Sequence, residues 1–184
     1  MISRDEALGL LRKYLRNDKL IAHSFAVEAI LREMARQLHE DEELWGLTGL
    51  LHDMDFEYTR DEPEKHTLVS AQMLEGLLPE QGIDAIKAHN YQHTNKLPIH
   101  ALDRALIASD AMSGLIIATA LVMPKKTLAE VKPSSVMNKF KDHSFASQIN
   151  RKRIELCEDT GFTLDIYIAL SLKAMQDIAD QLSL

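Results

Sequence analysis

The stretch that decides this fold runs Gly46-Leu47-Thr48-Gly49-Leu50-Leu51-His52-Asp53-Met54-Asp55. It is an apolar helical run with two glycines, and it ends in a histidine followed by an aspartate. A buried carboxylate costs several kcal/mol unless it is paired or bound to a metal. The neighbouring imidazole is the commonest type of metal ligand. The stretch therefore predicts a cation at the end of a buried helix, and the other ligands must come from elsewhere in the chain.

The composition favours a helical fold. The chain has 184 residues, of which 46% are hydrophobic, 27% charged and only 5% aromatic, and this length suits one domain with a real core. Leu, Ile, Ala and Met supply most of the apolar residues, and these are mostly good helix formers. Because no segment alternates with period two between hairpin turns, we expect an all-α fold and a single domain over 1–184.

Helical periodicity and capping residues locate the expected elements. Ser3 and Glu6 form a capping-box pattern that opens the first helix, and Asp18 is expected to cap the second. Acidic residues from Asp41 onward open the helix that leads to the His-Asp pair. Further helices are expected over 65–78, 79–89, 99–121, 127–131, 134–140 and 145–159, with a last one after Thr163.

Charge and cysteine content exclude some classes of protein. The formal net charge of −7 argues against a protein that coats nucleic acid. The single cysteine, Cys157, fits a reducing compartment and reads as a small buried residue. The longest apolar stretch, 111–123, is too short to cross a membrane, and the N-terminus lacks the features of a signal peptide. We expect a cytoplasmic protein that does not contact a membrane.

Four further residues are candidate partners for the His-Asp pair. They are His23, His66, His89 and Asp110, each on an apolar face or at the end of an expected helix. No basic residue in the adjacent apolar stripes is placed to pair with the two acids, so a metal is the expected counter-charge. Mixed histidine and aspartate ligands suit Mn, Fe, Co, Ni or Zn, and suit Mg less well.

The order of these residues resembles the HD superfamily of metal-dependent phosphohydrolases, whose pattern is H…HD…D on a helical bundle. The resemblance runs from about Asp18 to Gly114. The segments around His66 and His89 resemble the two additional histidines of binuclear members, the HDIG and HD-GYP branches. Residues 139–146 are similar to uncharacterised HDIG-type hydrolases. The resemblance implies a metal-site core over about 18–123, with C-terminal helices over 124–184 packed on it.

The resemblance also implies ligand roles and a reaction. His23, His52, Asp53 and Asp110 would hold a first divalent ion, and His66 and His89 a second, with Asp53 as the bridge. His52 and Asp53 would then be the catalytic pair. The reaction implied is attack of a metal-activated hydroxide on the phosphorus of a small phosphorylated substrate, a phosphomonoester or a nucleotide.

The sequence departs from the family pattern at two places, one after the His-Asp pair and one after His89. Met54-Asp55 stands where many relatives have Ile-Gly, so the local turn is expected to differ. The Gly-Tyr-Pro signature of cyclic-di-GMP phosphodiesterases is missing after His89, which argues against that substrate. Asp55 and Glu57 are interpreted either as hydrogen-bond acceptors behind metal-bound histidines or as exposed loop acids.

An acidic protein that binds an anion needs local positive charge. The densest basic cluster lies over 139–153, and from it Lys139, Lys141 and Arg151 are the candidate substrate-binding residues, with Lys139 and Arg151 preferred. Each of them could equally belong to a solvated helix face. His93, four residues after His89, is a further candidate at the rim of the site.

Two other interpretations remain open at this point. One is a non-catalytic module that senses a nucleotide or a metal, and the other is a structural helical bundle whose buried polar residues pair with one another. The presence of every expected ligand position favours catalysis. The sequence does not decide whether one or two ions bind, nor whether the chain forms a homodimer.

Overall fold

The computed structural model describes residues 1–184 and contains only helices, turns and loops. The single β feature is an isolated bridge between Glu75 and Leu78. The predicted all-α fold is therefore confirmed. One hydrophobic cluster of 42 buried residues extends from Ala7 to Leu182, so the N-terminal and C-terminal helices share a core.

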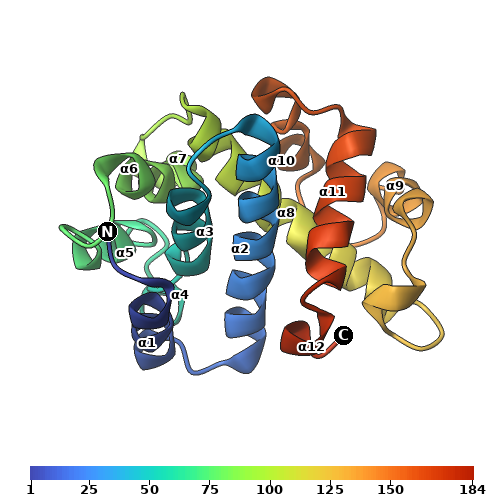
Figure 1. Ribbon diagram of the computed structural model, residues 1–184, viewed down its shortest axis with the longest axis horizontal. Coiled ribbons are helices and arrows are strands. Elements are labelled where there is room, and N and C mark those ends of the chain that lie inside the picture. The colour runs from blue at the N-terminus through green and yellow to red at the C-terminus, as the bar shows by residue number, and fades with distance from the viewer.

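Helix α2 (Asp18–Leu38) is the central element of the bundle. It packs against α3 (Glu42–Leu51) on one side and α11 (Leu164–Gln176) on the other, and α8 (Ala101–Leu121) crosses behind it (Figure 1). α1 (Arg4–Tyr14) packs on α3. This arrangement brings the second turn of α2, the end of α3 and the middle of α8 close together.

The helix starts follow ordinary capping chemistry. Ser3 and Glu6 form the predicted capping box at α1, and the side chain of Asp41 accepts from the backbone of Leu44 at the start of α3. The prediction for α2 is wrong by one residue, because Asn17 is the cap and Asp18 is the first helical residue. The acid there still lies where the helix dipole favours it.

Gly49 allows α3 to approach α2 closely. A Cβ at this position would lie 2.9 Å from Leu31 Cδ1 and 3.1 Å from the backbone nitrogen of Glu28. The second contact is to backbone, which cannot move without shifting α2. The glycine therefore fixes the separation of the two helices that carry His23 and the His-Asp pair.

Gly49→Ala is expected to destabilise the protein by about 1–3 kcal/mol, the usual cost of overpacking a closely packed interior. Gly9→Ala is the matched control, since nothing lies within 4 Å of a Cβ at that helical position. It should be neutral or stabilising by up to about 1 kcal/mol. Urea unfolding of both variants checks this, and equal stability of the two would show that Gly49 does not set the helix separation.

Short helices cover one end of the site. They are α4 (Phe56–Thr59), α5 (Leu68–Met73), α6 (Glu80–His89) and α7 (Tyr91–Thr94). The helix expected over 65–78 is much shorter than predicted. His66 precedes it in a turn, and Thr67 adopts the left-handed conformation with φ 72°. Asn90 donates to the carbonyls of Pro63 and His66, so this turn is held by a partner distant in sequence.

The C-terminal part wraps around α8. It contains η1 (Leu128–Glu130), α9 (Pro133–Lys141), α10 (Arg151–Glu155), η2 (Glu158–Thr160), α11 and α12 (Ala179–Leu182). The helix expected over 145–159 is wrong in its first half, where the chain forms turns up to Asn150. Asn150 then caps α10 by accepting from Lys152 N.

Arg151 explains why residues 142–150 form a loop rather than a helix. Its side chain is buried, and it donates to six backbone carbonyls: those of Lys139, Phe140, Asp142, Phe145, Ala146 and Ile149. A loop that turns its carbonyls toward one guanidinium satisfies both the buried cation and its own backbone. Its donors are therefore committed to the fold and are not free to bind a substrate.

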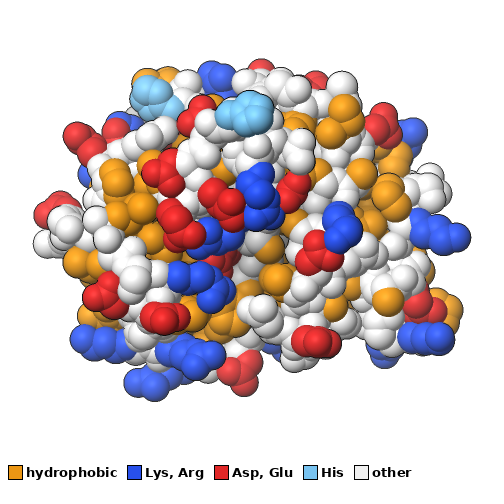
Figure 2. Space-filling model, in the orientation of Figure 1, with side chains coloured by type: hydrophobic (Ala, Val, Ile, Leu, Met, Phe, Trp, Pro, Cys, Tyr) orange, Lys and Arg blue, Asp and Glu red, His pale blue; other side chains and the backbone are white.

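The longest apolar helix belongs to the core. α8 is long and apolar enough to cross a membrane by length and composition, but 67% of its apolar window is buried inside the protein. α8 therefore packs as a core helix of the bundle. On the face crossed by α2 and α11, acidic and basic side chains are interspersed (Figure 2), and Arg32 and Arg36 there are paired with glutamates.

Candidate metal centre

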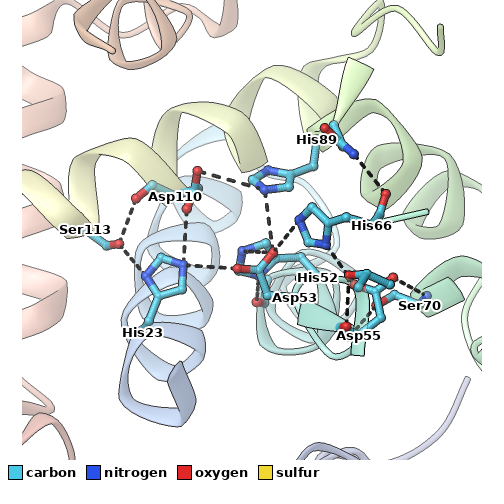
Figure 3. A network of polar contacts seen from close by, with 12 residues as sticks. His23, His52, Asp53, Asp55, His66, Ser70, His89, Asp110 and Ser113 are labelled. Atoms are coloured by element: carbon cyan, nitrogen blue, oxygen red, sulfur yellow. Dashed lines mark hydrogen bonds and ion pairs between the residues drawn. The ribbon is translucent and has the colours of Figure 1, made fainter. Parts of the chain in front are cut away.

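Six of the predicted site residues converge in one cluster between α2, α3, α6 and α8 (Figure 3). Their positions in the fold differ: His23 lies on α2, His52 caps the end of α3 with Asp53 next to it, His66 lies in the turn before α5, His89 ends α6 and Asp110 lies on α8. The fold thus brings together residues that are up to 87 positions apart in the sequence, from His23 to Asp110.

Asp53 is the centre of this cluster. Its Oδ1 lies 3.3 Å from His52 Nε2, 3.4 Å from His66 Nε2 and 3.6 Å from His89 Nε2. Its Oδ2 lies 3.8 Å from His23 Nε2. One carboxylate therefore faces four imidazoles.

Asp110 closes the other side. Its Oδ1 lies 3.2 Å from His23 Nε2 and its Oδ2 lies 3.9 Å from His89 Nε2. His23, His52 and Asp110 each present one ligand atom within 4.8 Å of the others, and so do His52, Asp53 and His89. In both triads the ligand atoms are close enough together to bind one metal ion.

Hydrogen bonds set the tautomers of three histidines. His52 Nδ1 donates to the carbonyl of Gly49 at 2.8 Å, and His66 Nδ1 donates to Asp55 Oδ1 at 2.9 Å. Ser113 gives its hydroxyl hydrogen to the Asp110 carbonyl, so its oxygen accepts from His23 Nδ1 at 3.1 Å. With Nδ1 acting as a donor in all three rings, Nε2 faces the cluster as the ligand atom.

The protonation states also suit a cation. Burial opposes ionisation of Asp53, but the imidazoles of His52, His66 and His89 hold its pKa well below the usual range. Burial likewise opposes ionisation of Asp110, and His89, His23 and Arg153 lower its pKa. Both acids are therefore carboxylates at neutral pH.

The histidines divide into two kinds. Burial lowers the pKa of His52, and it lowers the pKa of His89 to about 3, so both rings are neutral and able to bind a metal. Burial also disfavours the charged form of His23, but its ion pair with the Asp110 carboxylate raises its pKa. Burial disfavours charge on His66 too, yet the nearby carboxylates of Asp53 and Asp55 raise its pKa to about 10. An ion bound through Nε2 of His66 would displace the proton from that atom.

Two polar atoms at the centre have no hydrogen-bond partner. They are Nε2 of His52 and Oδ1 of Asp53, both buried from solvent. An unsatisfied buried polar group of this kind costs about 1–3 kcal/mol, and more when it is charged. A divalent ion would satisfy both atoms at once, so the residues present fit a metal.

Asp55 is a positioning residue behind His66. It is fully buried, and its second carboxylate oxygen accepts from the backbone nitrogen of Ser70 at 2.8 Å. Of the two interpretations given to Asp55 and Glu57, the structure supports the acceptor role for Asp55 only. Glu57 is exposed and accepts from the backbone of Arg16 instead.

Asp55→Asn is expected to weaken metal binding about 10–100-fold, the usual cost of losing an acceptor behind a metal-bound histidine. The amide has the same shape but cannot accept from both His66 Nδ1 and Ser70 N. Titration with Mn²⁺, followed by metal analysis, measures the effect. Glu57→Gln is the matched control and should bind as the wild type does. Equal affinity in both variants would remove Asp55 from the site.

The other predicted substrate-binding residues lie outside the cluster. Lys139 Nζ stacks 4.4 Å over the ring of Phe145, Lys141 is exposed at the end of α9, and His93 is exposed on α7. A cleft of about 390 Å³ opens beside His23 and Asp110, and none of these three residues lines it. The basic residue that does line it is Arg153, which the sequence placed in the basic cluster without singling it out.

Comparison with known proteins agrees with this geometry. The HD domain family model matches residues 20–115, which is more than half of the chain and includes every ligand candidate. An all-helical bundle with a histidine and aspartate centre is the class that the fold and site define. The chain belongs to the HD domain family.

Members of this family are generally hydrolases that bind divalent metals. Among curated proteins and solved structures, none matches the chain.

Proposed function

We propose that this protein is a metal-dependent phosphohydrolase that acts on a phosphomonoester or a small nucleotide. The observation that supports this most strongly is the pair of unsatisfied buried atoms, His52 Nε2 and Asp53 Oδ1, at the centre of an ionised cluster. The membership in the HD domain family adds the reaction type. The adjoining cleft beside His23 and Asp110 provides space for a small substrate.

The chain's own residues would act as follows. His23, His52, Asp53 and Asp110 would hold one ion, and His66 and His89 would hold a second, with Asp53 shared between them. A divalent ion bound there supplies a water of lowered pKa and positive charge that screens the phosphate. The mixed nitrogen and oxygen ligands favour Mn, Fe, Co, Ni or Zn over Mg.

The surroundings of the ligands support this role. Met54 and Leu51 are fully buried beside the pair, and His52 itself has no exposed surface. The hydrogen bond from His52 to the Gly49 carbonyl fixes the ring at the end of α3. Ligands held this rigidly favour a site organised before substrate arrives. A cytoplasmic location, expected from the single reduced cysteine, belongs to the same proposal.

Metal analysis and a substrate panel test the proposal. Protein purified without chelator should carry close to one or two equivalents of a transition metal, and should release phosphate from small phosphoesters in the presence of Mn, Co, Ni or Fe(II). Less than a tenth of an equivalent after incubation with these ions would contradict metal binding. Bound metal without phosphate release from any compound would instead favour the non-catalytic sensor.

A further inference from the structure

The cleft beside the metal centre has one wall that does not come from the HD domain. Gln148, Ile149, Asn150 and Arg153 line it opposite His23 and Asp110. The family match ends at residue 115, so this wall belongs to the C-terminal part of the chain. The family match therefore does not cover the residues of this wall, and their role has to be argued from their contacts.

Arg153 is the only lysine or arginine that lines the cleft. Its Nη2 lies 3.3 Å from Asp110 Oδ2, and it donates to the carbonyl of His89 at 3.2 Å. Its Nε is buried without a hydrogen-bond partner, although the side chain as a whole is 28% exposed. Arg151, two residues earlier, donates to six backbone carbonyls. Arg153 therefore has N–H groups available for a substrate, and Arg151 does not.

The third contact of Arg153 conflicts with metal binding by His89. Arg153 Nη2 lies 3.3 Å from His89 Nδ1, and a guanidinium has no acceptor, so Nδ1 must accept. The other three histidines use Nδ1 as a donor. If His89 Nε2 binds an ion, the neutral ring carries its hydrogen on Nδ1, and two donors then face each other.

If an ion binds at the cluster, the Arg153 guanidinium therefore loses hydrogen-bond acceptors. The contact to Nδ1 would be lost, and Asp110 would share its charge with the ion. The carbonyl of His89 would remain as an anchor. A guanidinium held at one point beside a divalent ion, with free N–H groups over a cleft, suits the fork geometry of a phosphate.

We propose that Arg153 binds the non-bridging oxygens of the substrate's phosphate, the role expected from the sequence for Lys139 and Arg151. This inference rests on the proposed function. It also implies that the three carboxamides of the cleft, Gln92, Gln148 and Asn150, contact the polar part of the substrate that carries the phosphate. Arg153 is a substrate-binding residue and not a metal ligand.

Calorimetric titration of the Mn²⁺-loaded protein with inorganic phosphate tests this directly. Arg153→Gln should weaken phosphate binding about 10–100-fold, since a hydrogen-bonded charge is lost, while the metal content stays at the wild-type level. Arg153→Lys should fall between the two, because it keeps the charge and loses the fork. The Michaelis constant for a phosphomonoester should rise in the same order.

Lys152→Gln is the matched control, since it removes one positive charge from an exposed neighbour outside the cleft. It should leave phosphate affinity within about twofold of the wild type. Unchanged phosphate affinity in Arg153→Gln with normal metal content would overturn the inference and leave the proposed function standing. Loss of metal in that variant would show that Arg153 only supports His89 and Asp110, which also overturns it. A wild-type protein that takes up no metal would overturn both proposals.

Discussion

Asp53→Asn is expected to remove bound metal and phosphohydrolase activity together. Three imidazole Nε2 atoms lie within 3.6 Å of Asp53 Oδ1, and Oδ2 faces a fourth histidine. The amide is neutral, so the cluster would keep only one carboxylate, Asp110, to offset an ion. The loss should exceed the roughly 10–100-fold that removal of an outer hydrogen-bond partner costs.

Metal analysis by mass spectrometry and phosphate release under saturating Mn²⁺ measure the two effects side by side. Asp61→Asn is the matched control, because it makes the same chemical change at an exposed position in the loop after α4. It should keep both metal and turnover. Turnover near the wild-type rate in Asp53→Asn would eliminate Asp53 as the bridging ligand.

Arg151→Met is expected to lower the free energy of unfolding by about 2–4 kcal/mol, through loss of charged hydrogen bonds that satisfy buried backbone. Methionine retains much of the apolar stem and removes every donor. Six carbonyls between Lys139 and Ile149 would then lose their partner. The figure is below the sum of six bonds, because part of the loop can turn toward water.

Urea denaturation of Arg151→Met beside Lys152→Ala measures this effect. Lys152 is exposed and its side chain is not needed by the loop, so its variant should change stability by less than about 0.5 kcal/mol. A stable Arg151→Met protein with weakened phosphate binding would return Arg151 to the substrate site. Loss of stability in that variant supports its assignment to the loop.

The fold class followed from helical periodicity, and so did the ligand positions on α2, α3, α6 and α8. His23 is conspicuous in the sequence because it interrupts an apolar stripe, and His89 because it ends an amphipathic helix. From the sequence, Asp55 and Glu57 are either acceptors behind metal-bound histidines or exposed loop acids, and neither is assigned to a particular histidine. The burial of Asp55 decides between the two interpretations. Burial of an acid in a loop depends on which distant segments pack over it, and the local sequence does not show this.

The errors share one physical origin. The segments 65–78 and 145–159 have helical composition, but side-chain donors bind backbone carbonyls there. Asn90 reaches the turn at His66 from a position distant in sequence, and Arg151 binds the carbonyls of the loop that precedes it. Such side-chain hydrogen bonds override helix propensity. For the same reason, the sequence shows the basic cluster over 139–153 but does not show that Arg153 is its member in the cleft. Which of two nearby arginines faces the cleft depends on the loop between α9 and α10.

The ligands of the centre come from residues as far apart as His23 and Asp110, and all of them belong to the folded chain alone. A bound ion would therefore act as a reversible cross-link that ties four helices at one point. Since the unfolded chain cannot offer this set, an ion at 100 times its dissociation constant would add about 2.7 kcal/mol to stability. The ion would raise the free energy of local unfolding most where α2, α3, α6 and α8 meet. Helix α12 carries no ligand, so its local unfolding would not depend on the ion. The supply of metal would then govern how long the folded chain survives as well as what it does.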